Sequence, residues 1–275
     1  MPDVAASVDF TLVRSAADGD RDALAQVLTA IKDQVYRLSV RMLWHPADAE
    51  DAAQEILIKV MTRLDSFGGR AAFETWVYRL AVNHLLTTRA RRAERAVVSF
   101  DELGIELSSG LDLPYDAAGV DEDLLVEEVK VGCTQAMLLC LDRPHRAAYI
   151  LGEIFDLSST EAAEILDVTP ATYRKRLSRA RARIQNFMRA HCGLIEVANE
   201  CRCSRRVGCA ISHGRTDPGR LLFAHQVQTS VRHVENLRDA AAVFQSQHEL
   251  KATGRIVEAI LATGFSGDFR SDTNT

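Results

Sequence analysis

The sequence lacks the features that mark membrane proteins and most enzymes. No apolar run approaches the roughly 18 residues that a membrane-spanning helix needs, and the N-terminus shows no basic-then-apolar signal pattern. We also find no phosphate-binding loop, nucleophile motif or pair of catalytic carboxylates. We therefore expect a cytoplasmic protein that is not an enzyme.

Aromatic residues are scarce, at 6% of a chain that is 47% hydrophobic and 26% charged. This composition is typical of a soluble, mostly helical protein, and 275 residues can form two or three small domains. Six cysteines do not resemble a disulfide scaffold, so in a reducing compartment they are free thiols, metal ligands or redox sensors. We predict an all-α fold of two helical domains, an acidic linker and a mostly helical C-terminal extension.

Acidic residues are absent from residues 168–189, which carry seven Arg and Lys although the whole chain has a formal charge of −5. Helical spacing predicts an apolar stripe of Tyr173, Leu177, Ala180 and Ile184. The opposite face carries Arg174, Lys175, Ser178 and Arg179. Such a face fits the phosphate-lined groove of DNA, and the alternative is an ordinary solvated face.

Capping signals predict that this basic helix is the second of a pair. Thr169 followed by Pro170 is typical of a helix start, and Ser158 with Glu161 forms a capping box for a short preceding helix. The turn between them often contains Gly, so Asp167 must adopt that conformation at some cost. This spacing indicates a helix-turn-helix, whose second helix enters the major groove.

Two further helices are predicted in the N-terminal part of the chain. The first begins near Asp48 and carries a polar face of Asp51, Gln54 and Glu55, which composition alone would leave solvated. The second, residues 73–83, mixes aromatics with Arg79 and Asn83 and precedes a cluster at Arg89, Arg91, Arg92 and Arg95. Aromatics beside cations suit single-stranded nucleic acid, whereas Trp76 could equally belong to the core.

Three segments in one order resemble a known family: DAEDAAQE at 48–55, FETWVYRLAVN at 73–83 and TYRKRLSRAR at 172–181. An acidic stretch separates the last two, with ten Asp and Glu and no Lys or Arg over residues 97–129. The pattern closely resembles the sigma-70 family, specifically the extracytoplasmic-function (ECF) sigma factors, which keep only the second and fourth conserved regions. The resemblance covers residues from about 9 to 190.

The resemblance implies partners and residue roles. Core RNA polymerase would be bound through its β′ clamp coiled coil and its β flap, and promoter DNA through two elements, while the polymerase itself would form the bonds. The implied residues for β′ binding are Asp51, Gln54 and Glu55; for the minus-ten element Phe67, Phe73, Trp76, Arg79 and Asn83; and for the minus-thirty-five element Thr172, Arg174, Lys175, Ser178 and Arg179. Tyr173 departs from the family, which usually has a small aliphatic there.

The same resemblance implies the domain boundaries. Region 2 would occupy residues 9–96, an acidic flexible linker 97–123, region 4 residues 124–189, and a Cys-rich, regulatory extension 190–275. The linker would run toward the RNA exit path, where its charge imitates nucleic acid. No cofactor is required for this function, and an anti-sigma factor is a candidate further partner.

The extension contains a cluster of soft ligands, namely His191, Cys192, Cys201, Cys203, Cys209 and His213. Thiolates and imidazoles suit zinc or another thiophilic metal such as copper(I), and thiol redox sensing or purely structural thiols are the alternatives. We expect the nearby Arg202, Arg205 and Arg206 to lower the thiol pKa values. Helices are expected over 220–250 and 251–262, and disorder from Gly264 onward.

Two other functions are alternatives to a sigma factor. A stand-alone helix-turn-helix regulator would need neither the Asp51 face nor the block at 73–83. A metal-dependent hydrolase would need a general base or a carboxylate ligand near the cysteines, and the sequence places none beside them.

Overall fold

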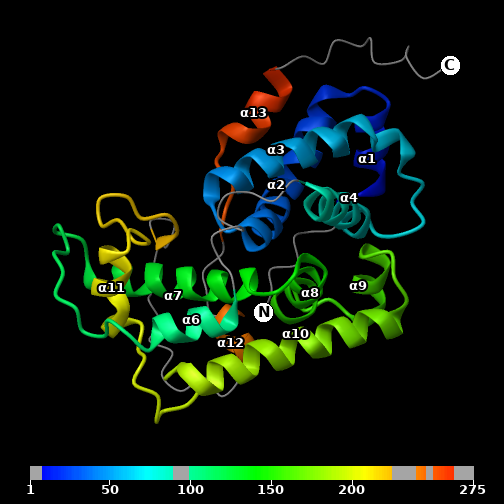
Figure 1. Ribbon diagram of the computed structural model, residues 1–275. Coiled ribbons are helices and arrows are strands. Elements are labelled where there is room, and N and C mark those ends of the chain that lie inside the picture. Colours follow the sequence, from blue (N-terminus) through cyan, green and yellow to red (C-terminus); the bar gives the residue numbers. More distant parts are fainter. Residues whose placement is uncertain (1–7, 89–98, 225–239, 246–249, 263–275) are drawn as a thin grey trace.

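The computed structural model describes residues 8–88, 99–224, 240–245 and 250–262, and every regular element in these ranges is a helix. The predicted all-α fold is confirmed. Figure 1 shows two helical lobes, one above the other, with C-terminal helices on both. Among the described helices, none combines the length and apolarity needed to cross a membrane.

The first lobe is built around one long central helix. The first two helices of the lobe, α1 and α2, are each capped by an aspartate. The Asp9 and Asp20 side chains accept hydrogen bonds from the first backbone N–H groups of these helices. The central helix, α2, contacts the three other α-helices of this lobe. Its buried stripe includes Leu24, Leu28 and Ile31. The elements are α1 (Phe10–Ala17), α2 (Arg21–Leu43), α3 (Pro46–Thr62), the 3-10 turn η1 (Leu64–Ser66) and α4 (Phe73–Thr87).

The second lobe contains the predicted helix-turn-helix. Its elements are α7 (Glu122–Leu139), α8 (Arg143–Tyr149), the π-helical turn η2 (Ile150–Ile154), α9 (Ser159–Ile165) and α10 (Pro170–His191). The capping box of Ser158 and Glu161 is formed, and Thr169 caps α10 with Pro170 in the first turn. Asp167 adopts a φ of 52°, so the turn has the left-handed conformation that the sequence required.

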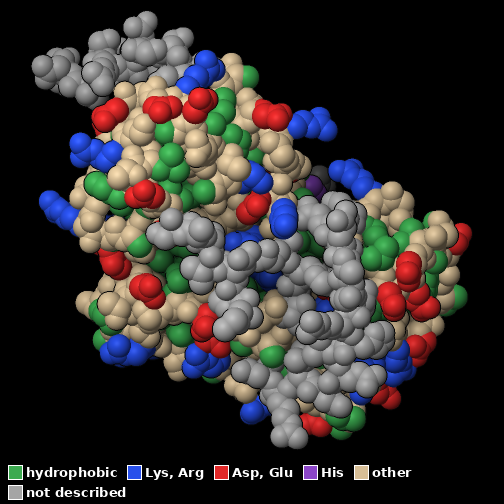
Figure 2. Space-filling model, turned by 180° about the vertical axis from the view of Figure 1, so that it is seen from behind, with side chains coloured by type: hydrophobic (Ala, Val, Ile, Leu, Met, Phe, Trp, Pro, Cys, Tyr) green, Lys and Arg blue, Asp and Glu red, His purple; other side chains and the backbone are tan. Residues whose placement is uncertain are grey.

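Over its described part, the acidic stretch that we interpreted as a flexible linker forms a helix and folds onto the extension. Helix α6 (Phe100–Leu107) begins at the Ser99 cap, and the Phe100 ring lies 5.2 Å from that of Phe187. Glu106 and Asp112 form ion pairs with arginines of the extension, namely Arg205, Arg206 and Arg215. Acidic side chains gather at this end of the molecule, on the right in Figure 2. The acidic composition therefore reflects charge pairing as well as solvation.

The extension divides between the two lobes. Its described elements are η3 (Ser204–Arg206), α11 (Val207–Ser212), α12 (Ala240–Gln245) and α13 (Arg255–Ala262). The expected helix over 251–262 is present from Arg255, whereas most of the expected helix over 220–250 and the expected disordered tail lie outside the described residues. Helix α12 packs in the second lobe and α13 packs on α2 and α3 of the first (Figure 1).

Two arginines of α8 join the lobes through helix ends. The guanidinium of Arg146, only 3% exposed, donates to the carbonyls of Leu138 and Leu141 at the end of α7, both at 3.0 Å, and to that of Met42 in α2. Arg143 donates to the carbonyls of Leu86, at 3.2 Å, and of Thr88 at the end of α4. Cations at helix C-termini complement the macrodipole, so these contacts stabilise the closed arrangement of the lobes.

Candidate nucleic-acid interface

Helix α10 presents the predicted basic face to solvent. Its apolar stripe is buried, with Tyr173, Ala180 and Ile184 each 0% exposed, as the periodicity predicted. The opposite face is a shallow groove lined by Ala171, Arg174, Lys175, Ser178 and Arg179, all exposed. Thr172 is exposed at the helix start, and its backbone N–H donates to the Thr169 hydroxyl at 3.2 Å. The five predicted minus-thirty-five residues therefore lie along one accessible side of α10.

Other arginines of α10 are engaged within the protein. Arg181 pairs with Glu153, and Arg183 lies over the Phe100 ring at 5.2 Å while donating to the Cys140 carbonyl at 3.3 Å. These contacts fix the rotation of α10 about its axis. The remaining basic side chains of the exposed face are thereby directed outward.

Tyr173 fits because a glycine faces it. Its hydroxyl donates to the Ala148 carbonyl at 3.4 Å, and a Cβ on Gly152 would lie 2.4 Å from this hydroxyl oxygen. Gly152 belongs to the π-helical turn η2, which makes room for the larger ring. Burial raises the pKa of Tyr173 to about 12, so the hydroxyl stays protonated and keeps its role as donor.

The predicted minus-ten residues on and before α4 are less accessible. Phe67 and Phe73 are 9% and 3% exposed, with ring centroids 5.2 Å apart, and the half-buried Trp76 stacks on Phe73 at 5.7 Å. In this arrangement the rings of Phe67 and Phe73 pack on each other and are buried, so their assignment to the minus-ten element stays a prediction. Of the five predicted side chains, Asn83 and Arg79 are exposed.

The second lobe contacts α4 beside Arg79, which itself stays exposed. The Arg79 guanidinium lies 3.2 Å from the carboxylate of Asp167 in the helix-turn-helix. One residue earlier, the Tyr78 ring lies 5.7 Å from that of Phe155, and burial raises the pKa of Tyr78 to about 12. The predicted phosphate-binding cluster from Arg89 to Arg95 lies outside the described residues.

The predicted polymerase-binding residues share one side of α3. Asp51 and Glu55 are exposed and Gln54 is half-buried, whereas Ala52, Ala53 and Ile56 between them are buried. Glu55 also lies 3.3 Å from Nε2 of His84 in α4, which fixes one edge of this polar face.

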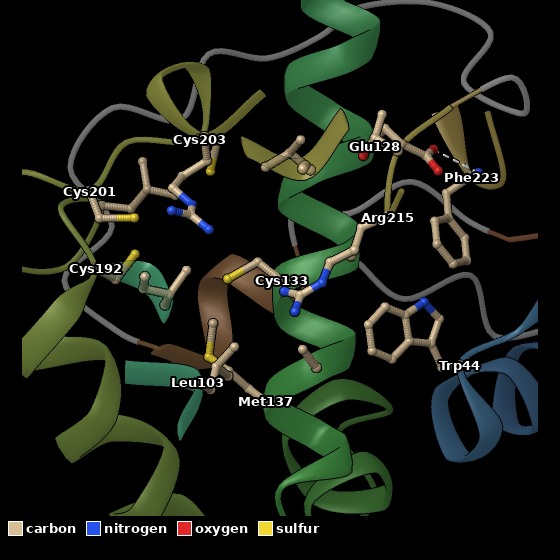
Figure 3. Close-up of a pocket in the computed structure, with 18 residues that line it drawn as sticks. Trp44, Leu103, Glu128, Cys133, Met137, Cys192, Cys201, Cys203, Arg215 and Phe223 are labelled. Carbon is tan, nitrogen blue, oxygen red and sulfur yellow. Dashed lines mark hydrogen bonds between the residues drawn. The ribbon is translucent and has the colours of Figure 1, made fainter. Parts of the chain in front are cut away.

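Three of the predicted metal ligands line one pocket with a cysteine that we did not predict. Cys192, Cys201 and Cys203 approach Cys133 of α7 around a cavity of about 70 Å³ at the junction of the two lobes and the extension. Figure 3 shows their sulfur atoms on the left and centre of this pocket, opposite Trp44 and Phe223. Cys192 and Cys201 also form an isolated parallel backbone bridge.

The predicted metal site is not formed with the predicted members. The ring of His191 packs against that of Phe187, with centroids 4.8 Å apart, and the Cys209 sulfur lies 3.3 Å from Nδ1 of His213. His191 and Cys209 are therefore engaged away from the other predicted ligands. Among the described residues, no three His, Cys, Asp or Glu side chains take an arrangement that could hold a metal ion.

The expectation of lowered thiol pKa values is also wrong. Loss of hydration raises the pKa of Cys201 to about 11 and of Cys203 to about 12, and it raises those of Cys133 and Cys192 as well. Nearby arginines lower these values only in part. The thiols are thus protonated at neutral pH, which disfavours rapid reaction with peroxides because the thiolate is the nucleophile.

Two structurally important residues had no sequence signal. Cys133 lies far from the other cysteines in sequence, and only the packing of α7 against the extension brings it to the pocket. Glu128, 3% exposed, accepts hydrogen bonds of 2.8–2.9 Å from three successive backbone N–H groups, those of Leu222, Phe223 and Ala224. A dashed line in Figure 3 marks the contact to Phe223. No sequence pattern around a glutamate within a helix predicts that its side chain binds three backbone N–H groups of a distant segment.

Comparisons with known proteins agree with this geometry. The family descriptions "Sigma-70 region 2" and "Sigma-70, region 4" match residues 27–96 and 132–184. The chain is 30% identical over 178 residues to the ECF RNA polymerase sigma factor SigW of Bacillus subtilis, covering 64% of this chain and 95% of that protein. It is 32% identical over 181 residues to the ECF RNA polymerase sigma-E factor of Escherichia coli K12, covering 65% and 93%.

Among solved structures, CnrH in complex with the cytosolic domain of CnrY aligns with a TM-score of 0.48 at 22% identity, covering 66% of this chain and 98% of that one. The two family matches fall on the two lobes that carry α4 and α10. The relatives are matched over nearly their whole length, and residues after 184 lie beyond both family matches. The chain therefore belongs to the extracytoplasmic-function sigma factors of the sigma-70 family, which bind core RNA polymerase and direct it to promoters.

Proposed function

We propose that this sigma factor divides promoter recognition between α10 and α4. Helix α10 enters the major groove at the minus-thirty-five element, with Arg174, Lys175 and Arg179 reaching bases and phosphates. The observation that carries this assignment is the exposed basic side of α10, flanked by arginines that the protein already holds in place. In such helices each good base contact contributes about 1–3 kcal/mol of discrimination.

Helix α4 captures melted bases of the minus-ten element. Trp76, Arg79 and Asn83 supply the contacts, and Phe67 with Phe73 form the floor on which Trp76 is held. Unstacking costs about 1–2 kcal/mol per base step, and stacking on an aromatic ring offsets part of that cost. The bond-forming chemistry belongs to the polymerase, and this chain selects the start site.

The polymerase docks on α3 through Asp51, Gln54 and Glu55, and the β flap contacts the second lobe. Domain boundaries follow from this division: 9–96 for region 2, 97–123 for the acidic connection, 124–189 for region 4 and 190–275 for the extension. The polar face of α3 supports this docking site, because its residues remain accessible while the lobes are closed.

The two promoter elements cannot be bound at the same time while the lobes are in contact. The elements are named for positions about 25 base pairs apart, which in B-DNA is about 85 Å. In the described structure Arg79 of α4 lies 3.2 Å from Asp167 of the helix-turn-helix. The lobes must therefore separate on the polymerase before initiation.

Reciprocal substitutions test the division of roles. We expect Arg174→Ala with Lys175→Ala to weaken binding to a minus-thirty-five duplex by about 10- to 100-fold, with binding to core polymerase unchanged. Gln54→Ala with Glu55→Ala should do the reverse. Arg189→Ala, an exposed arginine at the far end of α10, is the matched control for loss of charge.

Fluorescence anisotropy with a labelled duplex and co-purification with core polymerase supply the two readouts, and run-off transcription combines them. Loss of polymerase binding in the Arg174 and Lys175 variant would contradict the assignment of α10. Duplex binding without initiation by any form of the chain would favour the stand-alone helix-turn-helix regulator instead.

A further inference from the structure

The two helices of the far C-terminal segment bind different lobes. Helix α12 belongs to the second lobe, where Phe244 is fully buried and its ring lies 5.3 Å from that of Tyr149 in an edge-to-face arrangement. Gln245, the last residue of α12, donates from Nε2 to the Glu153 carbonyl at 2.7 Å. These contacts attach the helix to α8 and η2, next to the helix-turn-helix.

Helix α13 belongs to the first lobe, where it packs on α2 and α3. Its inward side chains Ile256, Val257 and Ile260 are at most 6% exposed, whereas Glu258 and Ala259 face solvent. Two hydrogen bonds of 3.0 Å attach the segment along α2: the Ala252 N–H donates to the Asp33 carboxylate, and the Arg21 guanidinium donates to the Leu261 carbonyl.

The connection between these helices is short. From Gln245 to Leu250 the chain makes five residue steps, which span at most about 18 Å even when fully extended. The connection between the lobes is longer, because even with α6 docked the 11 steps from Thr88 to Ser99 could reach about 40 Å. The C-terminal segment, and not the acidic connection, therefore sets how far the lobes can separate while α12 and α13 remain bound.

We propose that α12 and α13 form an intramolecular clasp, which holds the two lobes closed and must release one of them before both promoter elements are read. This inference rests on the proposed function, since it assumes that open lobes are the active form. The docked surface on α2 and α3 is thus an interaction site whose partner is a segment of the same chain.

Helix α13 is the part of the clasp that releases. Both helices are too short to be stable in water without tertiary packing, and α13 is held by only three buried aliphatic side chains. Phe244 of α12, in contrast, is enclosed by aromatic and aliphatic side chains of the second lobe. Opening therefore leaves α12 bound and frees α13.

A single charge on the buried side of α13 tests the clasp in the full-length chain. Ile260→Asp places a carboxylate in the contact with the first lobe, and Ala259→Asp places the same charge on the adjacent solvent-exposed position as the matched control. We expect Ile260→Asp to increase the radius of gyration of the free protein in small-angle X-ray scattering. Run-off transcription at limiting sigma factor should rise at least about fivefold, because the open state becomes the dominant one.

The Ala259→Asp variant should match the wild type in both measurements. If Ile260→Asp also matches the wild type in both, the clasp is overturned. If Ile260→Asp fails to fold by circular dichroism, the milder pair Arg21→Ala with Asp33→Ala carries the same expectation, because it removes the two hydrogen bonds along α2 and, besides them, only the contact of Asp33 with its neighbour Lys32. A larger radius of gyration with no initiation from any variant would support the clasp and contradict the proposed function.

Discussion

The two helices assigned to DNA recognition differ in their accessibility. Helix α10 has its basic side open to solvent, whereas α4 contacts the other lobe, through the exposed ion pair of Arg79 with Asp167 and the ring contact of Tyr78 with Phe155. The difference follows from which side of the helix-turn-helix faces the first lobe: α9 contacts α4, and α10 lies on the outer side (Figure 1). Under the proposed division of roles, duplex recognition is available in the closed arrangement, whereas full access to α4 for melted bases requires α9 to move away.

This comparison indicates an order of events. Under the proposed division of roles, a closed sigma factor would test duplex DNA through α10 first and hold an unpaired strand only after α9 has moved away from α4. Separation of the lobes on the polymerase would therefore couple strand capture to correct assembly. Three substitutions change either the contact between the lobes or the packing of α10, and their expected effects decrease from the first to the third.

The largest effect is expected from Arg146→Met, which removes the guanidinium that joins α8 to α2 and α7. Four carbonyl groups lose a charged donor in a buried site, so we expect the free energy of unfolding to fall by about 3 kcal/mol or more. Urea denaturation followed by circular dichroism measures this loss. A change below about 1 kcal/mol would mean that water replaces the guanidinium and that the contact does not hold the lobes together.

An intermediate effect is expected from Gly152→Ala, which disturbs the packing of α10 against η2. The added methyl group would meet the Tyr173 hydroxyl and the Leu177 side chain, so we expect a loss of about 1–3 kcal/mol in stability and weaker duplex binding. Gly132→Ala is the control, because a Cβ there meets nothing within 4 Å and should stabilise α7 by about 0.5–1 kcal/mol. Equal melting temperatures for the two variants would contradict the close packing of Tyr173.

The smallest effect is expected from Asp167→Gly, which removes the ion pair with Arg79. The pair is solvent-exposed and contributes at most about 1 kcal/mol, while glycine relieves the strain of the positive φ. We expect a shift of the melting temperature of about 2 °C or less in either direction. Binding of a single-stranded minus-ten oligonucleotide should increase modestly, and unchanged binding would show that Phe155, and not Asp167, limits access to α4.

The sequence predicted the local structure of the second lobe well. Thr169, Pro170 and the Ser158–Glu161 box are signals within one helical turn, and each one is found where the chain order placed it. Helical periodicity likewise identified the buried and exposed sides of α10, because a helix of this length packs with a single stripe. The positive φ of Asp167 followed from the short turn alone.

Contacts between distant segments could not be predicted in this way. The acidic stretch was interpreted as flexible because its composition is that of a linker, yet Asp112 and Glu106 find arginines about 100 residues later in the chain. The thiols were expected to be activated because arginines are near in sequence, but desolvation by the pocket is the larger influence. Burial and cross-lobe pairing depend on the complete fold, which no local spacing encodes.

Glu128 gives the clasp a kinetic character that a separate inhibitor would lack. Because its carboxylate fixes residues 222–224 to α7, everything beyond them is tethered to the second lobe. With α12 also bound, a released α13 stays at a high effective concentration near its docking site, set by the short connection from Gln245 to Leu250 and independent of how much protein the cell contains. Reclosure after each round of initiation would then be fast and unimolecular, so the fraction of closed molecules would not change on dilution.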